Sequence, residues 1–179
     1  MTARERVRTS LDHQEPDRLA VDLGSNPSSG ISAVAHAKLV AHLGRADQRT
    51  RVYDVVQQLA QPSDELLDRL GIDAVDIGRT FNTSEADWKP LTLPSGVETE
   101  IPAWFDPVLQ DDGALEAFTD DGLRIAAMPK GAAFFDQTYF PYLVGYPDDL
   151  SNLPQVMPLV LWSGLVHSPW DHAGDEGFW

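Results

Sequence analysis

The clearest indication of fold class lies in Leu19-Ala-Val-Asp-Leu23 and in the segment Gly24-Ser-Asn-Pro-Ser-Ser-Gly30 that follows it. The first five residues are apolar apart from Asp22 and predict a short strand. The next seven are too polar and too flexible for anything but a loop. A helix is expected at about residues 31–43, with Gly44 placed to cap its end. A strand is therefore followed by a loop and a helix.

Similar signals lie on both sides of this segment. Thr2-Ala-Arg-Glu5 is a capping-box pattern and predicts a helix at about residues 3–13. A second helix should follow the N-cap Ser63 and reach Leu70, where Gly71 stops it. Ile72-Asp-Ala-Val-Asp-Ile77 is the next strand candidate. The order helix, strand, helix, helix, strand is typical of an α/β protein.

The middle of the chain has a different pattern. Segments 88–93 and 97–101 predict a β-hairpin, and segments 115–119 and 123–128 predict another. The second hairpin turns at Asp120-Asp-Gly122, where Asp-Gly supplies the positive φ that tight turns require. We interpret residues 88–142 as an antiparallel insertion in an α/β body formed by about residues 1–87 and 143–179.

Composition excludes several classes of function. Lys and Arg total 13 against 28 Asp and Glu, so the net charge is −15. Nucleic-acid binding is not expected, because contact with a phosphate backbone requires a basic surface. The chain contains no cysteine, which removes disulfides and thiolate zinc sites. The N-terminus lacks the apolar region of a secretory signal, and no segment is apolar enough to span a membrane. We expect a cytoplasmic protein without membrane contact.

Two carboxylates are placed where active sites of α/β folds lie. Asp22 lies near the end of the strand predicted at 19–23, and Asp76 near the end of the strand predicted at 72–77. Both faces of a parallel sheet are buried, so a charge within such a strand must be paired or face a cavity. Active sites in these folds gather at the carboxyl ends of the strands. Asp73, in contrast, is interpreted as a solvated residue at the start of its strand.

Other chemistry has little support in the sequence. The pair His36 and His42 and the pair His167 and His172 are not spaced as metal ligands on one helix face, so no metal site is predicted. Turn formation explains the aspartate pairs that lie beside glycine or proline. The motifs of nucleophile-elbow hydrolases and nucleotide-binding loops are absent from the sequence.

The C-terminus carries unusual aromatic character. Ser168-Pro169 is a strong helix start, and Trp162, Trp170 and Trp179 place three of the five tryptophans in the last part of the chain. So much aromatic area at a ragged end predicts a missing partner surface, supplied by an oligomer or by a complementing chain.

Several segments resemble the uroporphyrinogen decarboxylase superfamily, and more narrowly its branch of decarboxylase-like proteins grouped with corrinoid-dependent methyltransferases. They occur in the family's order along most of the chain. The segments are Arg4-Glu-Arg-Val7, Leu11-Asp-His-Gln-Glu-Pro-Asp-Arg18, Val21-Asp22, Val52-Tyr-Asp-Val-Val-Gln-Gln-Leu-Ala60, Leu67-Asp-Arg-Leu-Gly-Ile-Asp73, Met128-Pro-Lys-Gly131 and Ser168-Pro-Trp-Asp-His172.

The resemblance implies a (β/α)₈ TIM barrel, of which this chain would form the N-terminal part with the β-hairpin insertion. A complete barrel needs about 250 residues, and the chain has 179. The resemblance further implies that Asp22, Asn26 and Asp76 line the barrel mouth and orient a small-molecule substrate. Zinc and a corrinoid protein are implied for the full-length enzyme, while no cofactor is expected in this chain.

Three functions follow as expectations. The first is the N-terminal portion of a corrinoid-linked methyltransferase that is inactive alone. The second is uroporphyrinogen decarboxylase, a carboxy-lyase of porphyrin biosynthesis. Decarboxylases of this family bind the carboxylates of the substrate with an arginine-bearing loop after the first strand. The corresponding loop, residues 24–30, contains no arginine. The third is a non-catalytic module that binds a partner through the Trp162–Trp179 surface.

Overall fold

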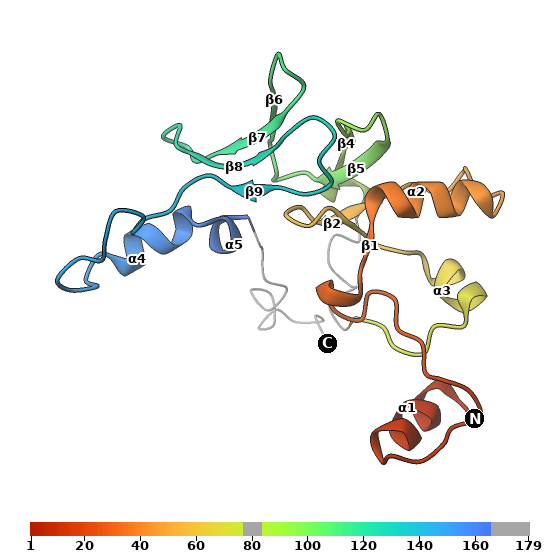
Figure 1. Cartoon of the computed structure of the whole chain (residues 1–179). Coiled ribbons are helices and arrows are strands. Elements are labelled where there is room, and N and C mark those ends of the chain that lie inside the picture. The colour runs from red at the N-terminus through yellow and green to blue at the C-terminus, as the bar shows by residue number, and fades with distance from the viewer. Residues whose placement is uncertain (77–83, 166–179) are drawn as a thin grey trace.

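A computed structural model describes residues 1–76 and 84–165. Helices and one small sheet make up the first part, and antiparallel strands dominate the second (Figure 1). The helices and 3₁₀ helices are α1 (Ala3–Leu11), η1 (Pro27–Ser29), α2 (Ala33–His42), α3 (Asp64–Leu70), η3 (Glu85–Asp87), α4 (Leu153–Val156), η4 (Met157–Leu159) and α5 (Leu161–Gly164). The strands are β1 (Ile31–Ser32), β2 (Val52–Asp54), β3 (Leu59–Ala60), β4 (Trp88–Thr92), β5 (Glu98–Pro102), β6 (Val108–Leu109), β7 (Leu115–Phe118), β8 (Arg124–Met128) and β9 (Asp136–Gln137).

Some sequence predictions lie outside the described residues. They are the end of the second predicted strand at Ile77, the helix start at Ser168–Pro169, the candidate ligands His167 and His172, and the tryptophans Trp170 and Trp179.

Local capping signals set the helix boundaries. The Thr2 hydroxyl accepts a hydrogen bond from the Glu5 amide at 3.2 Å, and the Glu5 carboxylate accepts one from the Thr2 amide at 2.8 Å, so the predicted capping box of α1 is confirmed. α1 ends at Leu11, two residues before the predicted end. The predicted limits of α3 are confirmed as well: Ser63 caps its start, and Gly71 adopts a left-handed conformation at its end.

The helix predicted at residues 31–43 begins later than expected. Ile31 and Ser32 form β1, which pairs with β3, and Ser32 caps the start of α2. β3 pairs in turn with β2, so an antiparallel sheet of order β1-β3-β2 forms in a region for which no strands were predicted. The sequence signals of such short strands are weak because each has only two or three residues.

Both predicted hairpins are confirmed. β4 pairs with β5 from Trp88↔Pro102 to Thr92↔Glu98, and β7 pairs with β8. At the second turn Gly122 has a φ of 85°, the conformation for which a glycine was expected. β6 and β9 add to the outer sides of the second hairpin and complete a four-stranded sheet of order β6-β7-β8-β9.

Within the described residues, the two strands predicted at 19–23 and 72–77 are reduced to a single bridge pair. Asp22 and Ala74 form an isolated parallel bridge. Within residues 1–76 and 84–165, parallel pairing does not extend beyond single bridges. Parallel strands are normally stable only as part of a sheet covered on both faces. The (β/α)₈ barrel with its first strands at these positions therefore stays a prediction.

One apolar core joins the two parts of the molecule. It includes Val52, Val55 and Val56 from the first sheet region and extends through Phe105 to Phe135. The rings of Phe105 and Phe135 pack edge to face with centroids 5.6 Å apart. Of the helices in the described ranges, none is long and apolar enough to cross a membrane.

Candidate functional site

The parallel bridge places one predicted site residue, Asp22, beside a segment that carries another, Asp76. The Asp22 backbone lies beside that of Ala74, and the Asp73 amide donates a hydrogen bond to the Val21 carbonyl at 2.8 Å. Asp76 follows Ala74 by two residues and is half-buried. The structure thus pairs Asp22 with Ala74, and Asp76 lies just beyond this bridge in the sequence.

Asp22 and Asn26 shape the loop that follows the bridge. The Asp22 carboxylate accepts hydrogen bonds from the Ser25 amide at 2.9 Å and the Ser25 hydroxyl at 2.6 Å. Partial burial would raise the pKa of Asp22, but these hydrogen bonds outweigh it, and the pKa is lowered. The Asn26 side chain accepts from the Ser28 amide and caps η1. Asp22 and Asn26 are exposed, so a ligand can reach a charged carboxylate and a polar loop here.

Tyr53 is a residue that the sequence analysis did not single out. Its hydroxyl is buried and finds no hydrogen-bond partner among residues 1–76 and 84–165. Burial, followed by the negative charges of Asp54 and Asp76, raises the pKa of Tyr53 to about 12. The phenol is therefore protonated at neutral pH and is available as a hydrogen-bond donor within the electrostatic influence of Asp76. The segment around Tyr53 was quoted only for its resemblance, and no local pattern marks the tyrosine because Asp76 is distant in the sequence.

The prediction for Asp73 is wrong. Its side chain is only 1% exposed, and it accepts hydrogen bonds from Arg6 at 2.5 Å, from Arg18 at 2.7 Å and from the Val21 amide at 2.9 Å. The Val21 amide and the two guanidinium groups hold the pKa of Asp73 below its ordinary value. Asp73 thus links the bridge segment to Arg6, Arg18 and the Val21 amide. The sequence analysis missed this role because both arginines are distant in the sequence.

Arg6 links this carboxylate to the N-terminus. Its guanidinium also holds Asp17, with Nε 2.7 Å from the carboxylate, and Asp17 in turn pairs with the Met1 amine at 3.0 Å. The hydrogen bond from Arg6 is the largest of the effects that lower the pKa of Asp17. Because Arg6 lies on α1, this network attaches the helix to the bridge.

A second ionic network stabilises a different part of the molecule. Arg49 and Arg51 both pair with Glu85 and Glu100 at distances of 2.7–2.9 Å. Arg51 also lies 5.2 Å from the centroid of the Trp88 ring. Hydrogen bonds from Arg49 and Arg51 lower the pKa of Glu85 to about 2. Since every acidic group of this network has a cationic partner, we assign it a structural role.

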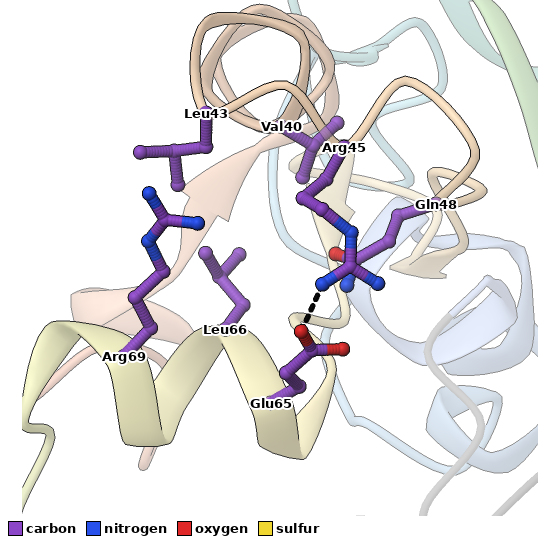
Figure 2. A pocket seen from close by; sticks show the side chains of 7 residues that line it. All are labelled: Val40, Leu43, Arg45, Gln48, Glu65, Leu66 and Arg69. Atoms are coloured by element: carbon purple, nitrogen blue, oxygen red, sulfur yellow. Dashed lines mark hydrogen bonds and ion pairs between the residues drawn. The ribbon is translucent and has the colours of Figure 1, made fainter.

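A small crevice between α2 and α3 offers little room for a ligand. Arg45 forms an ion pair with Glu65 across it, and Arg69 extends along its other side (Figure 2). Its volume is about 10 Å³, close to the least that holds one water molecule. None of the predicted site residues belongs to it. The lining residues are Val40, Leu43, Arg45, Gln48, Glu65, Leu66 and Arg69.

The described residues do not assemble a metal site. Among them, no group of three or more His, Asp or Glu side chains is placed to hold an ion. His36 is buried in α2, where its Nδ1 lies 3.0 Å from the Thr50 hydroxyl, and burial lowers its pKa. A neutral histidine in the core is thus a packing residue rather than a ligand of the Asp22–Asp76 site.

Comparison with known proteins identifies no relative. The sequence matches no family model and no curated protein, and no solved structure matches. Inferences about function therefore depend on the site itself and on the resemblance of individual segments.

Proposed function

We propose that this chain supplies the substrate-orienting part of a uroporphyrinogen decarboxylase-like barrel that takes part in corrinoid-linked methyl transfer in the cytoplasm. The single observation that carries the proposal is the parallel bridge between Asp22 and Ala74. Adjacent strands of a (β/α)₈ barrel are parallel, and its substrates bind at the carboxyl ends of those strands. Asp22 and Asp76 occupy this position if the bridge represents the first two barrel strands.

In this proposal the site binds and orients a substrate but does not complete the chemistry. The carboxylates of Asp22 and Asp76 accept hydrogen bonds from donor groups of the substrate, and Asn26 shapes the loop beside Asp22. Zinc activation of a thiol, implied by the resemblance, needs cysteine ligands, and the chain has no cysteine. The residues present therefore do not fit that metal centre, and methyl transfer requires further βα units.

Binding of a corrinoid tests the proposal directly. We expect methylcobalamin, added to the isotope-labelled chain, to shift the amide resonances of residues 22–26 and 74–76, while the chain alone transfers no methyl group to a thiol. The double variant Asp22→Asn/Asp76→Asn should lose most of these shifts. The matched control Asp68→Asn/Asp111→Asn removes two exposed carboxylates elsewhere and should keep them. Absence of shifts in the wild-type chain would contradict the proposal.

Decarboxylation of uroporphyrinogen is tested with the same samples. Its substrate carries several carboxylates, which are usually held by arginines. The loop of residues 24–30 has none, and it places the Asp22 carboxylate in the site instead. We therefore expect calorimetric titration with uroporphyrin to give no heat of binding. Heat together with protection of the loop would favour the decarboxylase over the methyltransferase.

A partner-binding role is the second candidate, and a separate observation favours it. Large apolar side chains on residues 140–162 are exposed, among them Leu143, Tyr146 and Trp162. Exposed apolar surface of this extent is typical of an interaction site. Such a role is compatible with the proposed substrate site, because the two surfaces are formed by different residues.

A further inference from the structure

An apolar segment lies close to the end of the described residues. We define it as residues 140–162 and call it the arm. Leu143, Val144 and Tyr146 are 78%, 101% and 83% exposed, and Leu150 is 52% exposed. Apolar side chains of this size gain free energy when they are removed from water. The arm therefore has a surface that gains from being covered.

The negative charge of the arm indicates which kind of partner surface can cover it. No Lys or Arg follows Lys130 in the sequence. Asp148 and Asp149 lie exposed within the arm, next to Leu150. Hydrogen bonds from Ser151 lower the pKa of Asp149, so its carboxylate is ionised at neutral pH. The complementary partner has an apolar surface beside at least two cationic side chains.

Helix α1 presents this combination. Arg4, Arg8 and Leu11 are spaced i, i+4 and i+7 and therefore lie on one helix face. All three are exposed, Leu11 by 72%. Within residues 1–76 and 84–165 neither Arg4 nor Arg8 forms an ion pair, and the Glu5 carboxylate is turned to the Thr2 amide in the capping box. The face of α1 is thus basic and apolar, as the arm requires.

The two surfaces are separated within one molecule. In Figure 1, α1 lies at the lower right, apart from the other helices and strands, and α4 lies at the left of the view. Contact between them therefore needs two chains. Two-fold symmetry lets each chain give its α1 to the other's arm, so that both contacts form at once.

We propose that the arm is the docking site of α1 from a second copy of this chain, in a reciprocal dimer. Arg4 and Arg8 pair with Asp148 and Asp149 of the other copy, and Leu11 covers Leu150 and its apolar neighbours. The inference is independent of the proposed methyl transfer, because it uses none of the residues at the Asp22–Asp76 site.

A charge exchange tests the dimer with the whole chain. Sedimentation velocity of the wild type should show a reversible dimer that weakens as salt is added. Arg4→Glu/Arg8→Glu and Asp148→Arg/Asp149→Arg should each weaken self-association by roughly tenfold or more. In each variant α1 and the arm carry charges of the same sign. An equimolar mixture of the two variants should form a dimer again, because both contacts are then between opposite charges.

A matched control separates local from general charge effects. Lys38→Glu/Lys130→Glu makes the same change of net charge as Arg4→Glu/Arg8→Glu, at exposed positions outside α1 and the arm, and should associate like the wild type. Circular dichroism of every variant establishes that it is folded. A wild-type monomer at all concentrations overturns the proposal. So does a dimer insensitive to both exchanges, a mixture that stays monomeric, or a control that weakens equally.

Discussion

Helix α1 and the four-stranded sheet β6-β7-β8-β9 are held in place by different forces. Arg6, which is 6% exposed, attaches α1 through charged hydrogen bonds to Asp17 and Asp73. The sheet is held by burial of side chains such as Leu115 and Phe135 in the common core. The strength of a charged contact depends on the protonation and geometry of its groups, while the stabilisation from apolar burial depends on how completely side chains fill the core. The two regions should therefore respond to different perturbations, and four experiments use this difference.

The largest effect is expected at the core. Phe135 is 2% exposed, and Phe135→Ala should lower the free energy of unfolding by about 3–5 kcal/mol, because it removes apolar contacts and leaves a cavity. Urea unfolding followed by fluorescence measures this loss. The neighbouring Phe134 is 53% exposed, and Phe134→Ala should change the free energy by no more than about 0.5 kcal/mol. Equal effects of the two substitutions would contradict the assignment of the core.

The next largest effect is expected at the attachment of α1. Asp73→Asn removes the charge that holds Arg6 and Arg18. Hydrogen exchange should become faster across α1 and residues 19–23 by roughly tenfold, since these segments lose their main anchor. Exchange in β7 and β8 should change little. The control Asp68→Asn, at an exposed position of α3, should leave all these rates unchanged. Equally faster exchange in β7 and β8 would contradict the separation of the two regions.

Acid should weaken the attachment of α1 before it weakens the sheet β6-β7-β8-β9. The pKa values of Asp17 and Asp73 are lowered in the folded protein, and that of Glu85 is lowered from 4.5 to about 2. A lowered carboxylate pKa stabilises the fold above the unfolded value, and this contribution is lost as the pH falls through the folded value. Burial also lowers the pKa of His36, so stability should start to decline below its unfolded value of about 6.5.

Thermal unfolding between pH 7 and pH 3 measures this decline, and hydrogen exchange locates it. After correction for the intrinsic pH dependence of amide exchange, protection of α1 should fall as the pH drops below the unfolded aspartate value of about 3.9, at a higher pH than protection of β7 and β8. An unfolding temperature that stays constant over the whole range would show that these groups have the same pKa in both states.

The smallest effect is expected from the capping box. Thr2→Ala removes the hydroxyl that accepts from the Glu5 amide and should destabilise α1 by about 1 kcal/mol. Hydrogen exchange in the first turn of α1 provides the measurement. Thr2→Ser retains an accepting hydroxyl and should behave like the wild type. A comparable loss in Thr2→Ser would show that the side-chain methyl group, and not the cap, stabilises the helix.

Part of the candidate site could be predicted, and the reason lies in the range of the interactions. Asp22 and Asp76 were identified from their places near the ends of predicted strands. The bridge pairs Asp22 with Ala74, two residues before Asp76, and the shared role of the two carboxylates stays a prediction. The buried Tyr53 and the anchoring role of Asp73 were missed because the groups that act on them are distant in the sequence. The strands at 19–23 and 72–77 were predicted too long, since hydrophobic alternation indicates a strand but does not supply its neighbours.

The sequence by itself determined the features that depend on neighbours within a few residues. The capping box of α1, the left-handed Gly71 and the turn at Gly122 belong to this class, because a side chain or a backbone conformation satisfies groups one turn away. Only the tertiary structure decided which segments lie side by side. It set the Asp22–Ala74 bridge, the burial of Asp73 and the environment of Tyr53, because each depends on free energies of burial and charge between distant segments.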